Sequence, residues 1–543
     1  MTDGNVGTLG AGLSRREALK LSLAAGVSFT LLGASAKIVQ AAGEQILKIA
    51  HPTFSQDWSP LRGGGPPFRW NSLWWASPMY FDGDGKINPY VFTSWETTDN
   101  KVWTFKLDPK ATFSDGSKIT SADVQASWNV AAMPNTKNQR ADQVLSKVAG
   151  FADLTGGTAK ELSGVAVPDE GTVVVTLSDV DPIFFMRLAN HIVPIAKASQ
   201  VRGEDGEEVA DWYMPANDTV YSGPFKLVEI DLDAGTLAFE PNENFFGPKP
   251  KLTRIELSSI EDNVTATSLL NSGEYNAHTE LITSTIIKDL GADFSSGPTI
   301  PTSQHFWFNT ARAPKVRQAL IMAVDREGLI KASYPDGPHK KTDQVLNSVP
   351  GADGSGFEPF PYDPEAAKKL LSESSYGGPE RLPKLLFVGV SGPAIEAAAQ
   401  YIAEQWRQNL GITAVDMKPQ QDAYAGPDQN AVQIFRDDVG TRVPDAVSYL
   451  AGSIASTSSN AQNKMGGYKN DKVDSLLTEA ASKAADDPQR IALAQEAQKA
   501  FREDWAFIPW YAQTMSRWAV AEVKGIDKNL DWQVVAPWEI SIG

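Results

Sequence analysis

Strand-like and helix-like segments alternate along the chain, and this alternation narrows its possible folds more than any other feature. Residues 102–107 (VWTFKL) alternate as a strand does, and residues 171–177 form a β-branched run that follows a turn signal. Apolar residues at helical spacing occupy positions 395–410, end at Gly411 and place Trp406 in the core. Without a short repeat, a low-complexity block or a long polar linker, the pattern predicts one integrated α/β protein.

Several helix starts and one hairpin can be predicted from local signals. Thr120 and Asp123 have capping-box spacing, and Asp363-Pro364 and Asp487-Pro488 place a proline where a helix loses no hydrogen bond. Residues 225–240 predict a hairpin that turns at positions 231–235. At 543 residues the chain is long enough for about three or four domains or subdomains.

The first forty residues have the features of an export signal. Arg15 and Arg16 precede an apolar stretch at residues 21–36, and a small-residue cleavage site follows near Ala41. The paired arginines resemble a twin-arginine signal, with general secretion, an amphipathic helix or a retained anchor as alternatives. No second apolar run of spanning length follows. We therefore expect a soluble protein of the periplasm, with no stable membrane insertion.

Charge and cysteine content exclude several classes of function. The chain has 49 Lys plus Arg against 66 Asp plus Glu, for a net charge of −17, and it has no basic block that would bind nucleic acid. The absence of cysteine excludes disulfides, thiolate zinc sites, iron–sulfur clusters and a cysteine nucleophile.

Sequence motifs for catalysis or for cofactors are also missing. No metalloprotease, nucleophile-elbow, phosphate-loop or dinucleotide motif occurs. The histidines are scattered, so we expect no metal and no cofactor; they are His51, His191, His278, His305 and His339. A hydrolase with two distant carboxylates leaves no local motif and stays as the competing class.

Residues 87–128 resemble the signature of the extracellular solute-binding proteins of family 5, the dipeptide, oligopeptide and nickel receptors of ABC importers. Trp95 ends a strand, Asp99-Asn100 turns, and Asp115-Gly116 turns again before the helix that begins after Thr120. One departure is Asp108, where members of the family usually carry a basic residue. Further matches in family order span nearly the whole chain after the signal: residues 222–227, 241–250, 269–274, 308–310, 316–326, 362–364, 467–474 and 508–511.

The resemblance implies a two-lobed periplasmic-binding-protein (clamshell) α/β fold, with an extra subdomain in the first lobe and two hinge crossings. The crossings are expected near residues 303–308 and 508–513, where His305, Trp307, Trp510 and Gln513 would face the floor of the cleft or pack the hinge. The implied division is 1–41 signal, 42–75 lobe I, 76–199 extra subdomain, 200–304 lobe I, 305–509 lobe II and 510–543 lobe I.

The resemblance also locates a candidate pocket in residues 435–446. Arg442 falls where peptide-binding members carry an aspartate for the ligand's ammonium group. A guanidinium binds a carboxylate or phosphate through two parallel hydrogen bonds, so we expect a ligand with an acid group, with Arg436 and Arg62 as further donors. If the register is shifted, Asp438 or Asp445 would receive an amine instead.

Three other segments are candidates for ligand contact by the same resemblance. Gly63 and Gly64 lie in a loop, residues 60–67, which either crosses the ligand or is simply flexible. Glu280 falls near another contact position of the family. Trp75 offers a planar face for stacking, although most tryptophans in such a chain belong to the core.

The function that follows is a periplasmic receptor that delivers a small solute to an ABC permease by lobe closure. An acidic amino-acid conjugate of the opine or Amadori type is the preferred ligand, a short peptide is next and an oligosaccharide is third. We expect a monomer that contacts its permease transiently and performs no catalysis. The alternative is an exported two-carboxylate hydrolase.

Overall fold

The structure is a computed structural model of the chain. It describes residues 45–51, 54–62, 65–82, 86–204, 206–279, 294–295, 299–309, 314–335, 337, 339–347, 349, 352, 357–419, 431–440, 443–514, 517–526 and 536–543. The predicted export signal and its cleavage position near Ala41 lie outside these residues.

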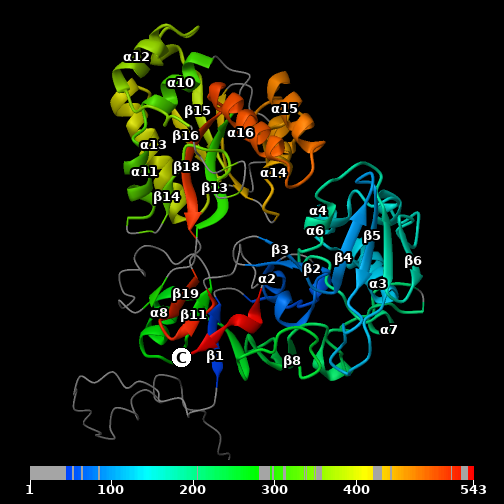
Figure 1. The fold of residues 1–543 in the computed structure, drawn as a ribbon. Coiled ribbons are helices and arrows are strands. Elements are labelled where there is room, and N and C mark those ends of the chain that lie inside the picture. The colour runs from blue at the N-terminus through cyan, green and yellow to red at the C-terminus, as the bar shows by residue number, and fades with distance from the viewer. Residues whose placement is uncertain are drawn as a thin grey trace, which may run out of the picture. The chain divides into compact units, whose positions relative to one another are not determined.

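The first large sheet has seven strands in the order β12-β19-β11-β1-β10-β9-β8 (Figure 1). Strand β1 lies inside this sheet, pairs in parallel with β10 and β11, and buries Leu47 and Ile49. The predicted hairpin is confirmed, since β8 and β9 pair antiparallel. The strands are β1 (Ile46–His51), β8 (Phe225–Asp231), β9 (Thr236–Pro241), β10 (Arg254–Ser259), β11 (Ala277–Thr279), β12 (Phe294–Ser295) and β19 (Arg517–Val520).

A four-stranded antiparallel sheet, in the order β4-β5-β7-β6, falls within the predicted extra subdomain. As predicted, the Asp123 carboxylate accepts the backbone N–H of Thr120 at 2.8 Å at the start of α3, the helix that contacts this sheet. The elements are β4 (Phe92–Thr97), β5 (Val102–Leu107), β6 (Val165–Asp169), β7 (Thr172–Thr176), α3 (Ser121–Ala132), α4 (Ala141–Leu145), α5 (Phe151–Thr155), α6 (Phe184–Arg187) and α7 (Ala198–Val201).

Shorter elements accompany these two sheets. They are α2 (Gly65–Trp74), α8 (Asn263–Asn271), the pair β2 (Met79–Phe81) and β3 (Ile87–Pro89), and the pair β20 (Val523–Lys524) and β21 (Ser541–Ile542). We refer to the seven-stranded sheet, the four-stranded sheet and these elements as lobe I.

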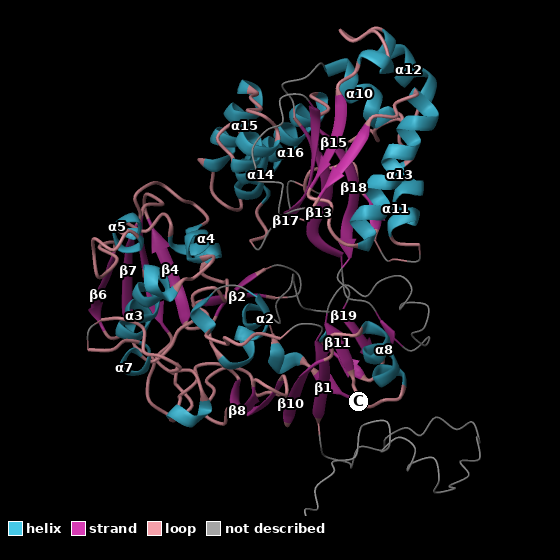
Figure 2. Cartoon of the chain, turned by 180° about the vertical axis from the view of Figure 1, so that it is seen from behind, coloured by secondary structure: helices cyan, strands magenta, loops and turns pink. Residues whose placement is uncertain are grey.

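The third sheet, with its helices, forms lobe II and has six strands in the order β14-β18-β13-β17-β15-β16. Helices α10 to α13 lie on one side of it and α14 to α16 on the other (Figures 1 and 2). The strands are β13 (Thr299–Phe308), β14 (Lys340–Lys341), β15 (Lys384–Val388), β16 (Val415–Lys418), β17 (Ala431–Gly440) and β18 (Phe507–Thr514). The helices are α10 (Pro314–Met322), α11 (Arg326–Ser333), α12 (Pro364–Ser372), α13 (Pro393–Leu410), α14 (Ala446–Ile454), α15 (Asp471–Ala481) and α16 (Pro488–Glu503).

The chain leaves the seven-stranded sheet after β12 and enters the six-stranded sheet with β13; it returns between β18 and β19. The predicted boundaries after residues 304 and 509 therefore fall inside β13 and β18. Over the paired residues both strands are part of the six-stranded sheet, and the division of the chain into lobes at these positions stays a prediction.

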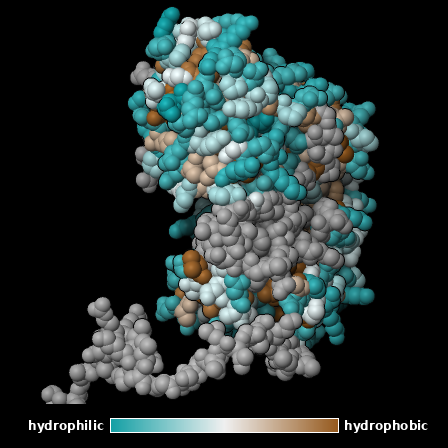
Figure 3. All heavy atoms as spheres, turned by 90° about the vertical axis from the view of Figure 1, so that its left-hand side faces the viewer, coloured by the Kyte–Doolittle hydropathy of each residue, from teal (hydrophilic) through white to brown (hydrophobic). Residues whose placement is uncertain are grey.

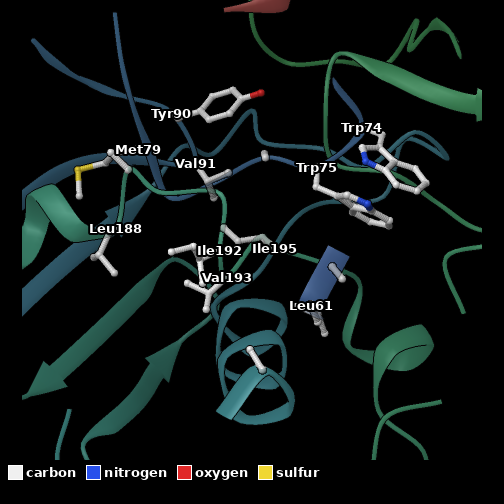
Figure 4. Packing of buried hydrophobic residues seen from close by; sticks show 14 of the residues in the cluster. Leu61, Trp74, Trp75, Met79, Tyr90, Val91, Leu188, Ile192, Val193 and Ile195 are labelled. Atoms are coloured by element: carbon white, nitrogen blue, oxygen red, sulfur yellow. The ribbon is translucent and has the colours of Figure 1, made fainter. Parts of the chain in front are cut away.

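Each lobe has its own apolar core. Figure 4 shows part of the lobe I core, in which Trp74 and Trp75 lie side by side. In lobe II, Trp406 is fully buried on α13 as predicted, and Gly411 ends that helix in the left-handed region at φ 73°. The predicted starts at Asp363 and Asp487 are confirmed, since each carboxylate accepts a backbone N–H of the helix's first turn.

Hydrophilic residues predominate in the coloured areas of the face shown in Figure 3. Within the described ranges, no helix combines the length and the apolar character that a bilayer crossing requires.

Candidate ligand-binding site

Strand β13 lies between β17 and β18, and its register brings polar residues from all three strands to one face of the sheet. Gln304 is opposite Asp438 on β17 and opposite Tyr511 on β18. Two positions along the strand, Phe306 is opposite Arg436. Because side chains alternate between the faces of a strand, Gln304, Tyr511, Arg436 and Asp438 share a face. This face carries the candidate site.

A chain of hydrogen bonds crosses the three strands at this point. Nη2 of Arg436 donates to Oε1 of Gln304 at 2.5 Å, and Nε2 of Gln304 donates to Oε1 of Gln513 at 3.2 Å. Gln304 is 4% exposed and Gln513 is 2% exposed, whereas Arg436 is half-buried. The Nε of Arg436 is buried and has no hydrogen-bond partner among the described residues. The arginine thus has donor capacity left over, which suits an anionic ligand.

Two tyrosines lie beside this chain of hydrogen bonds. The hydroxyls of Tyr334 and Tyr511 are 3.0 Å apart, and the ring of His339 stacks on Tyr511 with a centroid distance of 4.3 Å. Burial raises the pKa of both tyrosines, and nearby Arg436 only partly offsets this. Burial lowers the pKa of His339 to about 4. These three groups are therefore neutral at pH 7.

The other face of β17 serves packing. Asp437 is opposite His305 and forms an ion pair with Lys464, on the π-helix η6 (Asn460–Lys464). The Nε2 of His305 lies 2.7 Å from the carbonyl oxygen of Val345, and burial lowers the pKa of this histidine to about 4. His305, a candidate from the resemblance, is fully buried on the face that does not carry Arg436.

The tryptophans proposed for ligand contact are all core residues. Trp75, Trp307 and Trp510 are each 0% exposed. Trp75 packs against Trp212, with ring centroids 4.9 Å apart, and Figure 4 shows it inside the lobe I packing. Trp307 packs against Phe501 and Phe507. Buried rings of this kind present no face to a solute, so we correct their assignment to packing.

Asp445, the alternative amine acceptor, is also a structural residue. Its two oxygens accept from Nε and Nη2 of Arg490 at 2.7 and 2.8 Å, and it caps α14 through the backbone N–H of Ser448. The side chains of Asp445 and Arg490 are 7% and 4% exposed. With its oxygens engaged in a buried pair, Asp445 is corrected from a ligand contact to a helix anchor.

Arg62 ends the short 3-10 helix η1 (Pro60–Arg62) in lobe I and is held by two carboxylates. Its Nε donates to Asp57 at 2.8 Å and its Nη1 to Glu208 at 2.6 Å, with a further bond to the carbonyl of Thr136. Burial acts to lower the pKa of Arg62, but Glu208 and Asp57 outweigh it and the pKa is raised. The charge of Arg62 is therefore matched inside the protein.

Four predicted site residues lie outside the described residues: Gly63, Gly64, Glu280 and Arg442. The predicted charge reversal at Arg442 stays a prediction. Asp438 is exposed at the end of β17, and Gln513 is the inner partner of Gln304 rather than an exposed group.

Sequence reasoning missed Gln304, Tyr334 and Tyr511. The available signal was the strand itself: in any strand over residues 303–308, the period of two puts Gln304 on the face opposite to His305 and Trp307. As for metals, the described parts of the chain hold no group of three or more His, Asp or Glu side chains placed to bind an ion.

Comparison with known proteins defines the class. Residues 86–461 match the family described as bacterial extracellular solute-binding proteins, family 5, middle region. This match covers more than half of the chain, and the chain belongs to that family.

Named relatives are similar over most of this chain. Periplasmic oligopeptide-binding protein OppA of Salmonella typhimurium (strain LT2) is 27% identical over 92% of this chain and 94% of its own length. Periplasmic murein peptide-binding protein MppA of Escherichia coli is 27% identical over 60% of this chain and 62% of its own. These relatives are binding proteins and not enzymes, and the alternative of a hydrolase is not supported.

Solved structures show the same two-lobed fold. The unliganded open form of the murein tripeptide-binding protein MppA has a TM-score of 0.76, at 22% identity, and covers 92% of this chain and 98% of that one. NikA of Brucella suis in complex with Fe(III)-EDTA has a TM-score of 0.74, at 19% identity, over 92% of this chain and 100% of that one. The predicted periplasmic-binding-protein fold is confirmed.

Proposed function

We propose that this protein is the periplasmic receptor of an ABC importer and that it captures a short peptide or peptide-like solute through a free carboxylate. Membership of the solute-binding family supports the receptor role, and the names of OppA and MppA support a peptide-class solute. The observation that carries the choice of an acid group is the environment of Arg436.

Arg436 has a neutral partner, Gln304, and one donor that has no partner among the described residues. A guanidinium offers donors only, in a planar fork that matches the two oxygens of a carboxylate. Gln304 takes one of these donors without neutralising the charge, and the buried Nε has no partner in the described part of the chain. A carboxylate that reached this fork would gain a charge-assisted pair of hydrogen bonds in a partly dehydrated setting, where such bonds are strong.

We rank a peptide ahead of an opine or Amadori conjugate. Both classes carry a carboxylate, so Arg436 does not distinguish them. The preference for the conjugate rested on Arg442 alone, and no relative reported above is named for such a ligand. The conjugate is the second candidate.

Lobe closure would couple capture to transport. A solute that contacts both lobes stabilises the closed form by its differential affinity for that form, and the permease would recognise that form. The receptor releases the solute unchanged.

The test compares one tripeptide as the free acid and as its C-terminal amide, by titration calorimetry at pH 7, together with an opine and an Amadori compound. We expect the free acid to bind at least about tenfold more tightly than the amide, because one charge-assisted contact contributes about 1.5–3 kcal/mol. Mass spectrometry of the recovered peptides should show no product. Equal affinity for the acid and the amide would contradict the proposed role of the carboxylate.

The variant Arg436→Met tests the residue itself. Methionine keeps much of the apolar stem but has no donor, so the acid should lose its advantage while the amide binds as before. The matched control is Arg407→Met on α13, because Arg407 is exposed and pairs locally with Glu404. If the acid binds Arg436→Met as tightly as it binds the parent protein, Arg436 does not contact the ligand.

Export and assembly follow from the same proposal. We expect Arg15→Lys combined with Arg16→Lys to block export if the signal is of the twin-arginine type, and the exported protein should begin near Ala42. A native mass of one chain is expected; a stable dimer would contradict the monomer prediction.

A further inference from the structure

Two buried glutamines link the candidate arginine to the strand that leads back to lobe I. Gln304 lies in the middle of β13, and Gln513 is one residue before Thr514, where β18 ends. The next strand along the chain, β19, already belongs to the seven-stranded sheet. We infer that Gln304 and Gln513 form a positioning pair that orients the guanidinium of Arg436 and keeps its charge available for an acid-bearing ligand. This inference rests on the proposed function, in which Arg436 receives the carboxylate.

The direction of the hydrogen bonds is fixed by the chemistry of the three side chains. A guanidinium can only donate, so the Gln304 amide must turn its oxygen toward Arg436. Its NH₂ group then points to Gln513, whose oxygen must accept. An amide flip at either glutamine would set two donors or two acceptors against each other. The pair therefore holds one orientation.

Burial keeps water from replacing these bonds. The two glutamines are 4% and 2% exposed, so an amide that lost its partner would stay unpaired in a poorly solvated site. The strand register supports the contact, because Arg436 is opposite Phe306 and reaches Gln304 along the diagonal of the ladder. Phe306, itself 0% exposed, limits the space in which the arginine stem can move.

A neutral amide at this position has a specific consequence. A carboxylate in place of Gln304 would still accept from Arg436, but it would neutralise the guanidinium as Asp57 and Glu208 neutralise Arg62. The amide orients the arginine without competing with an anionic ligand. Gln304 and Gln513 are thus positioning residues that determine selectivity, with no contact to the ligand required.

The experiment measures the ratio of affinities for a free-acid tripeptide and its amide in three variants. Gln513→Leu removes the acceptor that holds the Gln304 amide and affects Arg436 only through Gln304, so we expect the ratio to fall about threefold or more. Gln304→Glu keeps the size of the side chain and adds a counter-charge, so the ratio should fall about tenfold or more.

The matched control is Gln433→Leu. Gln433 is 3% exposed on β17, three residues from Arg436, and its side chain therefore lies on the opposite face. We expect this variant to lose stability as Gln513→Leu does, with the ratio unchanged. Thermal unfolding of each variant separates a general loss of fold from a loss of selectivity, and Gln304→Glu, being of the same size, keeps the test valid if a leucine variant unfolds.

The outcomes separate the two proposals. If Arg436→Met abolishes the acid preference while Gln304→Glu and Gln513→Leu keep it, the positioning pair is refuted and the proposed function stands. If Arg436→Met itself leaves the preference intact, the proposed function fails at this residue. A fall in the ratio for Gln433→Leu equal to that for Gln513→Leu would also refute the pair, because it would show a general effect of core damage.

Discussion

Arg62 in lobe I and Arg436 in lobe II look alike in the sequence, and both were predicted to bind an acid group. The structure gives them different surroundings. Arg62 is held by the carboxylates of Asp57 and Glu208, whereas the hydrogen bond recorded for Arg436 goes to the neutral amide of Gln304. A cation is therefore available to a ligand only where its partners inside the protein do not neutralise its charge.

Arg490 in lobe II is a third arginine, and its side chain is almost completely buried. It makes a two-bond ion pair with Asp445 and also donates to the carbonyl of Ala480. Three arginines therefore span a range from full pairing to a neutral partner, and only the last suits an anionic solute. If this range is what decides function, substitution of a paired arginine should change stability, and substitution of Arg436 should change ligand binding.

The largest effect is expected for Arg490→Met. Removal of one partner of a buried ion pair leaves the other charge unpaired, so the free energy of unfolding should fall by about 3–5 kcal/mol. Urea denaturation measures this loss. The ratio of affinities for acid and amide peptides should not change in the folded fraction.

A double variant provides the control for that experiment. Arg490→Met combined with Asp445→Leu replaces both charges with apolar groups and should recover much of the lost stability. If the double variant changed the ratio of affinities for acid and amide without losing stability, Asp445 would be a ligand contact and not a structural residue.

The buried histidines differ from the arginines, because burial lowers their pKa and they lose their proton instead of pairing with a carboxylate. Burial lowers the pKa of His278 in lobe I to about 4, and neither ring nitrogen has a hydrogen-bond partner within the described residues. The unfolded chain protonates this group near pH 6.5 and the folded protein only near pH 4. The unfolded state therefore binds more protons between these values, and stability falls as the pH is lowered from 6.5 toward 4.

We expect His278→Leu to flatten this decline. A pKa difference of this size corresponds to about 2–3 kcal/mol between pH 7 and pH 4, so the variant should retain that much more of its neutral-pH stability than the parent protein does. Unfolding midpoints at pH 7, 6, 5 and 4 measure the difference. Parallel curves for the two proteins would show that His278 titrates normally in the fold.

Much of the fold was predictable because the signals for it are local. The hairpin of β8 and β9, the helix start after Asp363 and the end of α13 at Gly411 each depend on residues that are neighbours in the sequence. The family resemblance supplied the two-lobed architecture, which local patterns alone do not define.

The site was predicted less well, because pairing across the sequence decides what each residue does. Arg436 was proposed as a donor to an acid group, but its partner Gln304 is 132 positions away and Gln513 is 209 positions from Gln304. Trp75 was chosen for its planar ring and Asp445 for its place in a shifted register of the resemblance, while their roles depend on Trp212 and Arg490, which are distant in the sequence. Composition and spacing contain no information about such partners.

The smallest effect is expected for Arg62→Met, and it tests the comparison most directly. Loss of the bonds to Asp57 and Glu208 should lower the free energy of unfolding by about 1–2 kcal/mol, a value reduced because the arginine is partly exposed to water. The ratio of affinities for the acid and the amide should stay at its original value, because the charge of Arg62 is already neutralised by Asp57 and Glu208. Titration calorimetry with the same two tripeptides, carried out on Arg62→Met and Arg436→Met together, measures the ratio for both variants. If Arg62→Met lowers the ratio as much as Arg436→Met does, then a paired arginine also holds the solute, and pairing is not what separates a structural cation from a binding one.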